Sequence, residues 1–155
     1  FGGALKNIAI GFGSARGKGI VHTAGNVNPT WAKLGATSQS AFLETRAEAV
    51  NGFVKKFKKE NIVYINVAYN LSVDCDCDSH PAPPEMADIG IFASLDPIAV
   101  DQACVDAVYN SQDPGKASLI KRMEKQIAVH ILERGEELNL GKRKYEVWLK
   151  ICFYV

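Results

Sequence analysis

Residues 74–80 (DCDCDSH) gather two cysteines, three aspartates and a histidine in seven consecutive positions. If the segment is extended, side chains alternate, so Cys75 and Cys77 share one face and the aspartates the other. Two thiolates on one face are soft ligands that suit an iron–sulfur cluster, zinc or copper(I), and His80 would add a nitrogen ligand. The C-x-C spacing differs from the C-x2-C of common zinc sites, and the flanking acids favour protonated thiols. The pattern therefore leaves two interpretations: a metal or redox site, or a solvated acidic loop with two incidental thiols.

A second candidate is a carboxylate in an otherwise apolar helical row. On the helix expected over residues 97–110, Asp101 lies three and four positions from apolar residues on both sides. An unpaired buried carboxylate is costly, so Asp101 needs a partner: Lys6, Arg16, a bound metal or a backbone donor. We treat Asp101 as a candidate ligand-binding residue, with a structural carboxylate between helix and loop as the alternative. Asp96 is expected to cap the same helix and stays a weaker candidate for ligand binding.

A third candidate is the glycine-rich stretch at residues 11–19 (GFGSARGKG). Four glycines are expected to break any helix and to expose backbone N–H groups, which together with Arg16 and Lys18 suit a bound anion. The stretch matches neither the dinucleotide-binding fingerprint nor the P-loop pattern. An ordinary flexible turn is the alternative.

Hydrophobic periodicity predicts the elements that position these residues. Helices are expected at residues 2–12, 38–59, 97–110 and 117–134, strands at 61–71, 88–95 and 145–153, and loops at 21–33 and 72–87. The strand at 61–71 is almost continuously apolar, which predicts burial on both faces, whereas the one at 145–153 alternates, as expected near an edge. Gly135 is expected to end the helix at 117–134, in which His130 is expected to be a core histidine with satisfied hydrogen bonds.

Short strands mixed with long amphipathic helices predict an α/β fold, in which a layered mixed sheet packs against amphipathic helices. The length of 155 residues suits a single domain over residues 1–155. The chain opens at Phe1 within a structured-looking segment, which predicts a truncated N-terminus and a sheet completed by missing sequence or by a partner.

The composition limits the classes of protein to which this chain can belong. The chain is 47% hydrophobic and 23% charged, as is usual for globular proteins, and its net charge of +1 gives no reason to expect binding to nucleic acid or membrane. No apolar run approaches the ~20 residues that cross a bilayer, and no signal peptide is recognisable. Four cysteines in a chain of this size do not indicate a secreted disulfide framework, so we expect a cytoplasmic protein.

Three further stretches carry a family resemblance: residues 1–8 (FGGALKNI), 66–78 (NVAYNLSVDCDCD) and 88–103, which begins DIGIFASLDP. Over most of its length the chain resembles a domain of unknown function found in proteins called uncharacterised iron–sulfur centre proteins. The resemblance implies a ferredoxin-like insert with a C-x2-C-x2-C-x3-C-P run, placed after a glycine-rich stretch and a histidine similar to residues 13–22.

That insert is absent here, because residues 23–37 contain no cysteine, so four-cysteine ligation of a cluster does not carry over. The residues that carry over by position are Lys6, Cys75, Cys77, Asp96 and Asp101.

Three functions follow as hypotheses. The leading one is a redox-associated domain that binds a metal, a cluster or a small ligand through Cys75 and Cys77. Lys6 and Asp101 would then contact these ligand residues and not the metal itself. The second is a metal-independent domain that binds a small molecule or anion through the glycine-rich stretch, Arg16 and Lys6. The third is a structural domain that positions a ferredoxin-type or other redox partner. No catalytic triad can be assembled from the sequence, so no reaction is predicted.

Overall fold

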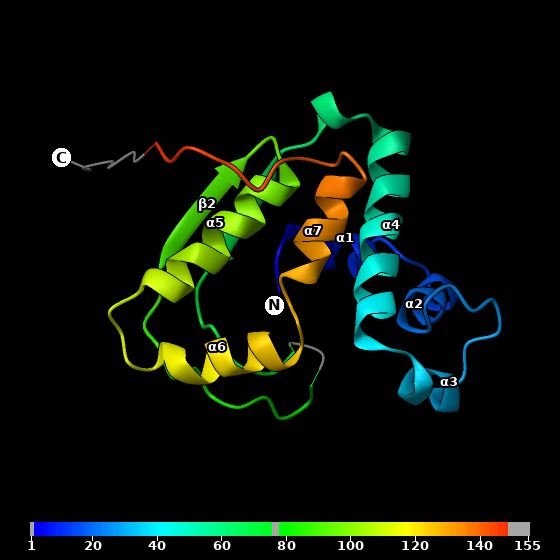
Figure 1. Cartoon of the computed structure of the whole chain (residues 1–155), viewed down its shortest axis with the longest axis horizontal. Helices are drawn as coiled ribbons and strands as arrows, with labels where there is room; N and C mark the ends of the chain where they lie inside the picture. The colour runs from blue at the N-terminus through cyan, green and yellow to red at the C-terminus, as the bar shows by residue number, and fades with distance from the viewer. Residues whose placement is uncertain (1, 76–77, 149–155) are drawn as a thin grey trace.

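Seven α-helices and two β-strands occupy the residues that the computed structural model describes, 2–75 and 78–148 (Figure 1). The helices are α1 (Ala4–Gly11), α2 (Ala15–His22), α3 (Trp31–Ala36), α4 (Gln39–Phe57), α5 (Pro97–Asn110), α6 (Lys116–Lys125) and α7 (His130–Glu137). The strands are β1 (Tyr64–Ala68) and β2 (Gly90–Ser94), and a short 3-10 helix, η1 (Lys59–Asn61), precedes β1. The fold is thus α/β, mostly helical, with a small sheet.

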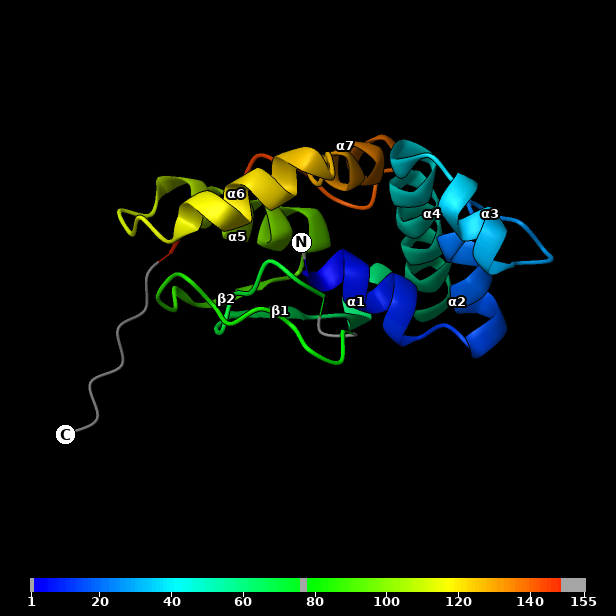
Figure 2. The same cartoon turned by 90° about the horizontal axis from the view of Figure 1, so that it is seen from below.

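The elements form two layers, which Figure 2 shows from the side. Helices α5, α6 and α7 lie on one side of the sheet, and α4 stands beside both layers with α2 and α3 beyond it. The two strands pair antiparallel, with Asn66 opposite Phe92. Our prediction of a mixed sheet is therefore wrong for the described residues, because the two strands there run in opposite directions. The main core lies where α1, α4, α5 and α7 meet and includes Leu5, Val50, Ile98 and Leu132.

Two of the predicted helices form where a capping residue and an apolar period coincide. Ser38 caps α4, and Asp96 caps α5 by accepting hydrogen bonds from the backbone N–H groups of Ile98 (2.8 Å) and Ala99 (3.0 Å). Pro97 fills the first position of α5, where its missing N–H is not needed. The apolar period of this segment predicts a stripe of Leu43, Ala47, Val50, Val54 and Phe57; the first four are buried, whereas Phe57 at the end of α4 is 53% exposed.

The glycine-rich stretch contains a helix, so the prediction that it breaks every helix is wrong. The Ser14 hydroxyl accepts a hydrogen bond from the Gly17 N–H at 3.1 Å and caps α2. A Cβ atom on Gly19 would lie 2.8 Å from Pro29 Cγ, so glycine here allows a close approach of the following loop. The cap and this packing offset a glycine penalty of about 1 kcal/mol per residue. The loop predicted at 21–33 is correspondingly shorter.

The helix predicted over residues 117–134 is divided into α6 and α7. The chain changes direction at Ile127, whose φ is 43°. The apolar residues of α6 pack in a small cluster with Met86 and Val108, whereas those of α7 pack in the main core. The change of direction lets each helix face its own cluster. Helix α7 then runs through Gly135, which the sequence predicted as the end of the helix.

β1 is buried on one face only, which corrects the prediction for residues 61–71. Tyr64 and Ala68 are buried on the side of α5, whereas Ile65 and Val67 are 62% and 60% exposed. An antiparallel sheet covered by helices on one side has this alternating burial.

After α7 the chain runs along α5 without forming a strand. The Tyr145 hydroxyl donates a hydrogen bond to Asp106 Oδ2 at 2.7 Å. Residues 145–148 have no strand pairing, so the predicted strand at 145–153 is wrong in its described part, and its remainder lies outside the described residues.

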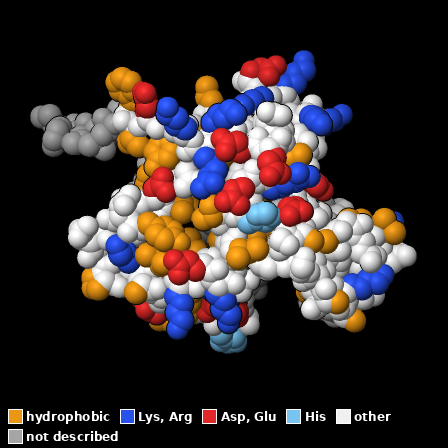
Figure 3. Space-filling model, in the orientation of Figure 1, with side chains coloured by type: hydrophobic (Ala, Val, Ile, Leu, Met, Phe, Trp, Pro, Cys, Tyr) orange, Lys and Arg blue, Asp and Glu red, His pale blue; other side chains and the backbone are white. Residues whose placement is uncertain are grey.

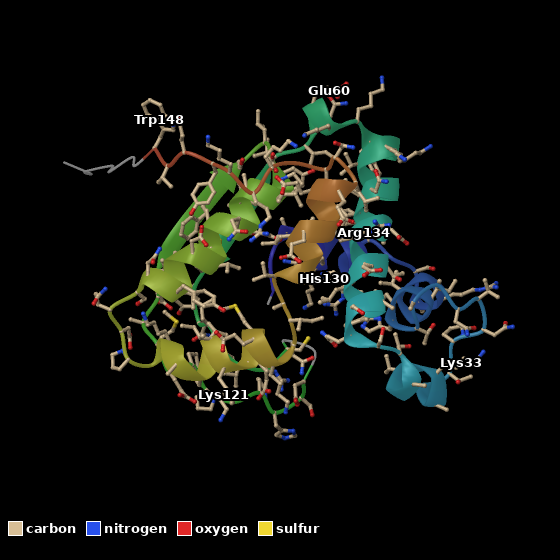
Figure 4. All side chains as sticks on the ribbon, in the orientation of Figure 1. Lys33, Glu60, Lys121, His130, Arg134 and Trp148 are labelled. Atoms are coloured by element: carbon tan, nitrogen blue, oxygen red, sulfur yellow. The ribbon has the colours of Figure 1, made fainter. Side chains whose placement is uncertain are left out.

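Ion pairs join α7 to α4, and Figure 4 shows His130 and Arg134 between the two helices. His130 Nε2 lies 2.9 Å from Glu44 Oε1, and Arg134 donates a hydrogen bond to Glu48 at 2.9 Å. The His130 side chain is 31% exposed, so it is an ion-paired residue of the helix boundary and not the core histidine we predicted. Acidic and basic side chains mix over this boundary, while hydrophobic side chains gather between α5 and α6 (Figure 3).

The His130–Glu44 pair predicts a pH-dependent contribution to stability. The hydrogen bond with Glu44, together with Glu133, raises the pKa of His130 above its ordinary value. The pair therefore stabilises the fold fully below the unfolded pKa of about 6.5, and this contribution is lost as the pH rises through the folded pKa. We expect Glu44→Gln to lower the unfolding temperature near pH 5.5 and to have a smaller effect near pH 8.5.

The matched control is Glu48→Gln, which removes one of the two carboxylate partners of Arg134, an arginine that stays charged over this range. Its effect should not change with pH. A Glu44→Gln effect that is equally large at both pH values would contradict the prediction.

Candidate ligand-binding cavity

A cavity of about 790 Å³ lies between α1, α4, α5, α6 and the loop that follows β1. Apolar side chains in its walls include Phe42, Leu43, Val105, Val108, Leu119 and Met123, and Ile65, Val67 and Tyr69 also line it. The amide side chains of Gln39, Asn66 and Gln126 interrupt these walls. A cavity of this size with a few polar groups is typical of a site for a small molecule.

Three cationic side chains from three helices line the cavity: Lys6 of α1, Arg46 of α4 and Arg122 of α6. Asp74 is the single carboxylate among the described lining residues, so cationic side chains outnumber anionic ones three to one. The Arg46 guanidinium lies 3.9 Å from the centre of the Phe42 ring, and this cation–π contact orients it. Arg122 lies 3.8 Å from Asp74, and because the Arg122 side chain is 46% exposed this ion pair is weak.

Asp101 fixes the helix turn that carries Lys6. Its Oδ1 accepts a hydrogen bond from the Ala4 N–H at 2.7 Å, and its Oδ2 accepts one from the Leu5 N–H at 3.0 Å. The Asn66 side-chain amide donates to Oδ1 at 2.7 Å. Burial raises the pKa of Asp101, and the three hydrogen bonds oppose that shift. Backbone donors, one of the candidate partners given above, are thus its partners. Asp101 does not itself line the cavity but positions Lys6 and Asn66, which do.

Hydrogen bonds within residues 69–89 hold the outer wall of the cavity. Asp74 Oδ2 accepts a hydrogen bond from the Ala82 N–H at 3.0 Å, and the Ser72 hydroxyl donates to the Ala82 carbonyl at 2.7 Å. The loop is therefore folded back on itself, with both arms lining the cavity.

Of the predicted metal ligands, Cys75 lies in this wall, Cys77 lies outside the described residues, and His80 is exposed and does not line the cavity. The Asp78 N–H donates a hydrogen bond to the Cys75 carbonyl at 2.9 Å. Cys104 of α5 also lines the cavity, but burial raises the pKa of its thiol to about 11, which keeps it protonated at neutral pH. No three His, Cys, Asp or Glu side chains of the described residues form a metal-binding group. The described residues therefore do not supply the four thiolates of an iron–sulfur cluster.

The residues of the predicted anion site do not lie together in the structure. Lys6 lines the cavity, whereas Arg16 and Lys18 are exposed on α2 and do not. Asp96 caps α5 and does not line the cavity either.

Arg46 and Arg122 were not predicted as site residues. Arg46 lies three residues after Leu43, beside the apolar stripe of α4. A charged residue next to a buried row could therefore have indicated Arg46 as a site residue. The same signal pointed to Asp101. The sequence offers no such signal for Arg122, because nothing in it distinguishes Arg122 from its neighbour Lys121.

A family model for a domain of unknown function, DUF362, matches residues 1–106. The match confirms the resemblance to a domain of unknown function, while the association with iron–sulfur centres stays a prediction. The matched part includes Lys6, Arg46 and Asp101, but Arg122 lies beyond it. No curated protein and no solved structure matches the chain. Within residues 2–75 and 78–148, no helix combines the length and apolarity needed to cross a bilayer.

The contact between Gly3 and Asp101 predicts a position-specific effect of adding one methyl group. A Cβ atom on Gly3 would lie 2.5 Å from Asp101 Oδ1, whereas one on Gly2 would meet nothing within 4 Å. We expect Gly3→Ala to lower the free energy of unfolding by about 2 kcal/mol, because the carboxylate must move away from its donors. Gly2→Ala should change it by less than about 0.5 kcal/mol. Urea unfolding followed by circular dichroism measures both, and equal effects would contradict the prediction.

Proposed function

We propose that this chain, which belongs to the DUF362 family, binds a small organic anion in the cavity lined by Lys6, Arg46 and Arg122. One observation carries the proposal: among the described lining residues, three cationic side chains face one carboxylate in a cavity that also presents apolar side chains. The volume of about 790 Å³ lies within the range of roughly 300–1,000 Å³ of small-molecule sites.

The walls indicate the chemistry of the ligand. Arginine guanidinium groups pair with the oxygens of a carboxylate or a phosphate, often through two parallel hydrogen bonds. The apolar walls favour a ligand whose remaining part is hydrophobic. A molecule with an anionic group at one end and an apolar body satisfies both kinds of wall.

The positive charge is local and not a property of the whole chain. The net charge is +1, and the exposed surface between α4 and α7 carries both signs. Apolar side chains beside these cations reduce the screening by solvent relative to the open surface, but less at Arg122, which is 46% exposed and pairs with Asp74.

Binding of an anion should depend on Arg122. We expect Arg122→Gln to weaken the binding of inorganic phosphate and of benzoate roughly tenfold, because one charge-assisted contact is lost. Arg122 is partly exposed on α6, so its substitution should leave the fold intact. Isothermal titration calorimetry at low ionic strength measures the affinities.

The matched control is Lys121→Gln, because Lys121 is the neighbouring cation on α6 and does not line the cavity (Figure 4). Arg16→Ala with Lys18→Ala tests the glycine-rich stretch in the same way. The proposal fails if neither anion binds, or if a control weakens binding as much as Arg122→Gln does.

A metal-associated function is the second candidate, favoured by the position of Cys75 in the wall of the same cavity. The ligand set would be Cys75 with Cys77, and His80 would lie five residues further along the chain. A transition metal held there would add a Lewis acid or redox centre next to the anion site.

This candidate predicts metal in the purified protein. We expect stoichiometric zinc or iron after anaerobic purification, and its loss in the variant Cys75→Ser/Cys77→Ser. Elemental analysis together with acid-labile sulfide separates a single metal from a cluster. Wild-type protein without metal rejects this candidate and leaves anion binding untouched.

A further inference from the structure

The small sheet has a second face that is apolar and uncovered. Ile65 pairs with Ala93 and Val67 with Ile91, and these pairs point away from α5. Six large apolar residues at alternating positions make up this outer sheet face: Val63, Ile65, Val67, Tyr69, Ile91 and Leu95. Each is at least 60% exposed. In Figure 2, α5, α6 and α7 all lie on the opposite side of the strands.

An apolar outer sheet face departs from the usual pattern of a solvated sheet. Antiparallel sheets with one face in water carry polar residues on that face, whereas sheets apolar on both faces are covered on both. From the exposed fractions, the six side chains present roughly 700 Å² of surface, which exceeds the largest apolar patch of most monomers.

We propose that a second copy of this chain covers the outer sheet face, so that two sheets pack face to face around a two-fold axis. Roughly 700 Å² from each copy gives roughly 1,400 Å² in total, within the range of stable protein interfaces. A two-fold interface brings each residue patch against its own copy. None of the six side chains carries a charge, so this self-contact brings no like charges together. Polar or charged residues at these positions would not allow the same arrangement.

The proposal does not require the anion site to be occupied, although Ile65, Val67 and Tyr69 of the outer sheet face also line that cavity. It predicts a dimer of the full chain in solution. Sedimentation velocity over about 1–100 µM should show a dimer of the wild-type chain. The variant Ile65→Lys/Ile91→Lys should be monomeric, with a dimer dissociation constant at least tenfold larger. Both positions are exposed, at 62% and 72%, so the variant should retain its circular dichroism spectrum. Ile91→Lys alone, at the most exposed position, repeats the test if the double variant does not fold.

The matched control is Val27→Lys, which places the same charge at a residue that is 61% exposed in the loop between α2 and α3. The control should remain a dimer. A wild-type monomer at every concentration overturns the proposal, and so does a dimer that survives Ile65→Lys/Ile91→Lys. A monomer whose unfolding temperature falls on Ile91→Lys would show that the face is covered within the same polypeptide, which also overturns it.

Discussion

The hydrogen bonds of Asp101 join three elements at one buried point. A helix begins with backbone N–H groups that lack partners within the helix, and the carboxylate satisfies two of them in α1 while its negative charge interacts favourably with the helix dipole. The third donor comes from Asn66 in the middle of β1. Three donors compensate a carboxylate that is 0% exposed, because Oδ1 accepts two of the hydrogen bonds and Oδ2 accepts the third. Lys6 follows directly on this turn, so the cavity takes its geometry from the same interaction.

Local patterns predicted those parts of the fold that local physics determines. Helices α4 and α5 carry a capping residue and an apolar period within one segment, and both were predicted nearly to the residue. The burial of Asp101 followed from the same period. Its partners did not, because Ala4 lies 97 positions away in the chain and periodicity describes a single element. The helix at Ala15–His22 was missed because glycine propensity outweighed a Ser14 cap in the prediction.

The candidate site, too, could be predicted only where a local pattern marks its residues. The density of thiols and carboxylates at residues 74–80 drew attention to a segment that contributes one wall of the cavity. Arg46 and Arg122 are ordinary residues of amphipathic helices, and they share a cavity because α4 packs against α1 while α6 packs against α5, on either side of the space that they line. A motif search weighs unusual local composition, whereas this cavity is built from common residues of several elements. Of the three described cations that line the cavity, only Lys6 was predicted, as a possible partner of Asp101, as an anion-binding residue and by the family resemblance.

The inner and outer faces of the sheet are coupled through the register of β1. Side chains alternate along a strand, so the hydrogen bond between Asn66 and Asp101 on the inner face also determines that Ile65 and Val67 point outward. A shift of one residue would break that hydrogen bond and turn the apolar pair inward. The loop that carries Cys75 leaves β1 directly and returns through β2, so both ends of this cavity wall are anchored in the sheet. A cover on the outer face that stabilised the strand pair would therefore also hold the cavity wall in place, because Ile65, Val67 and Tyr69 belong to both surfaces.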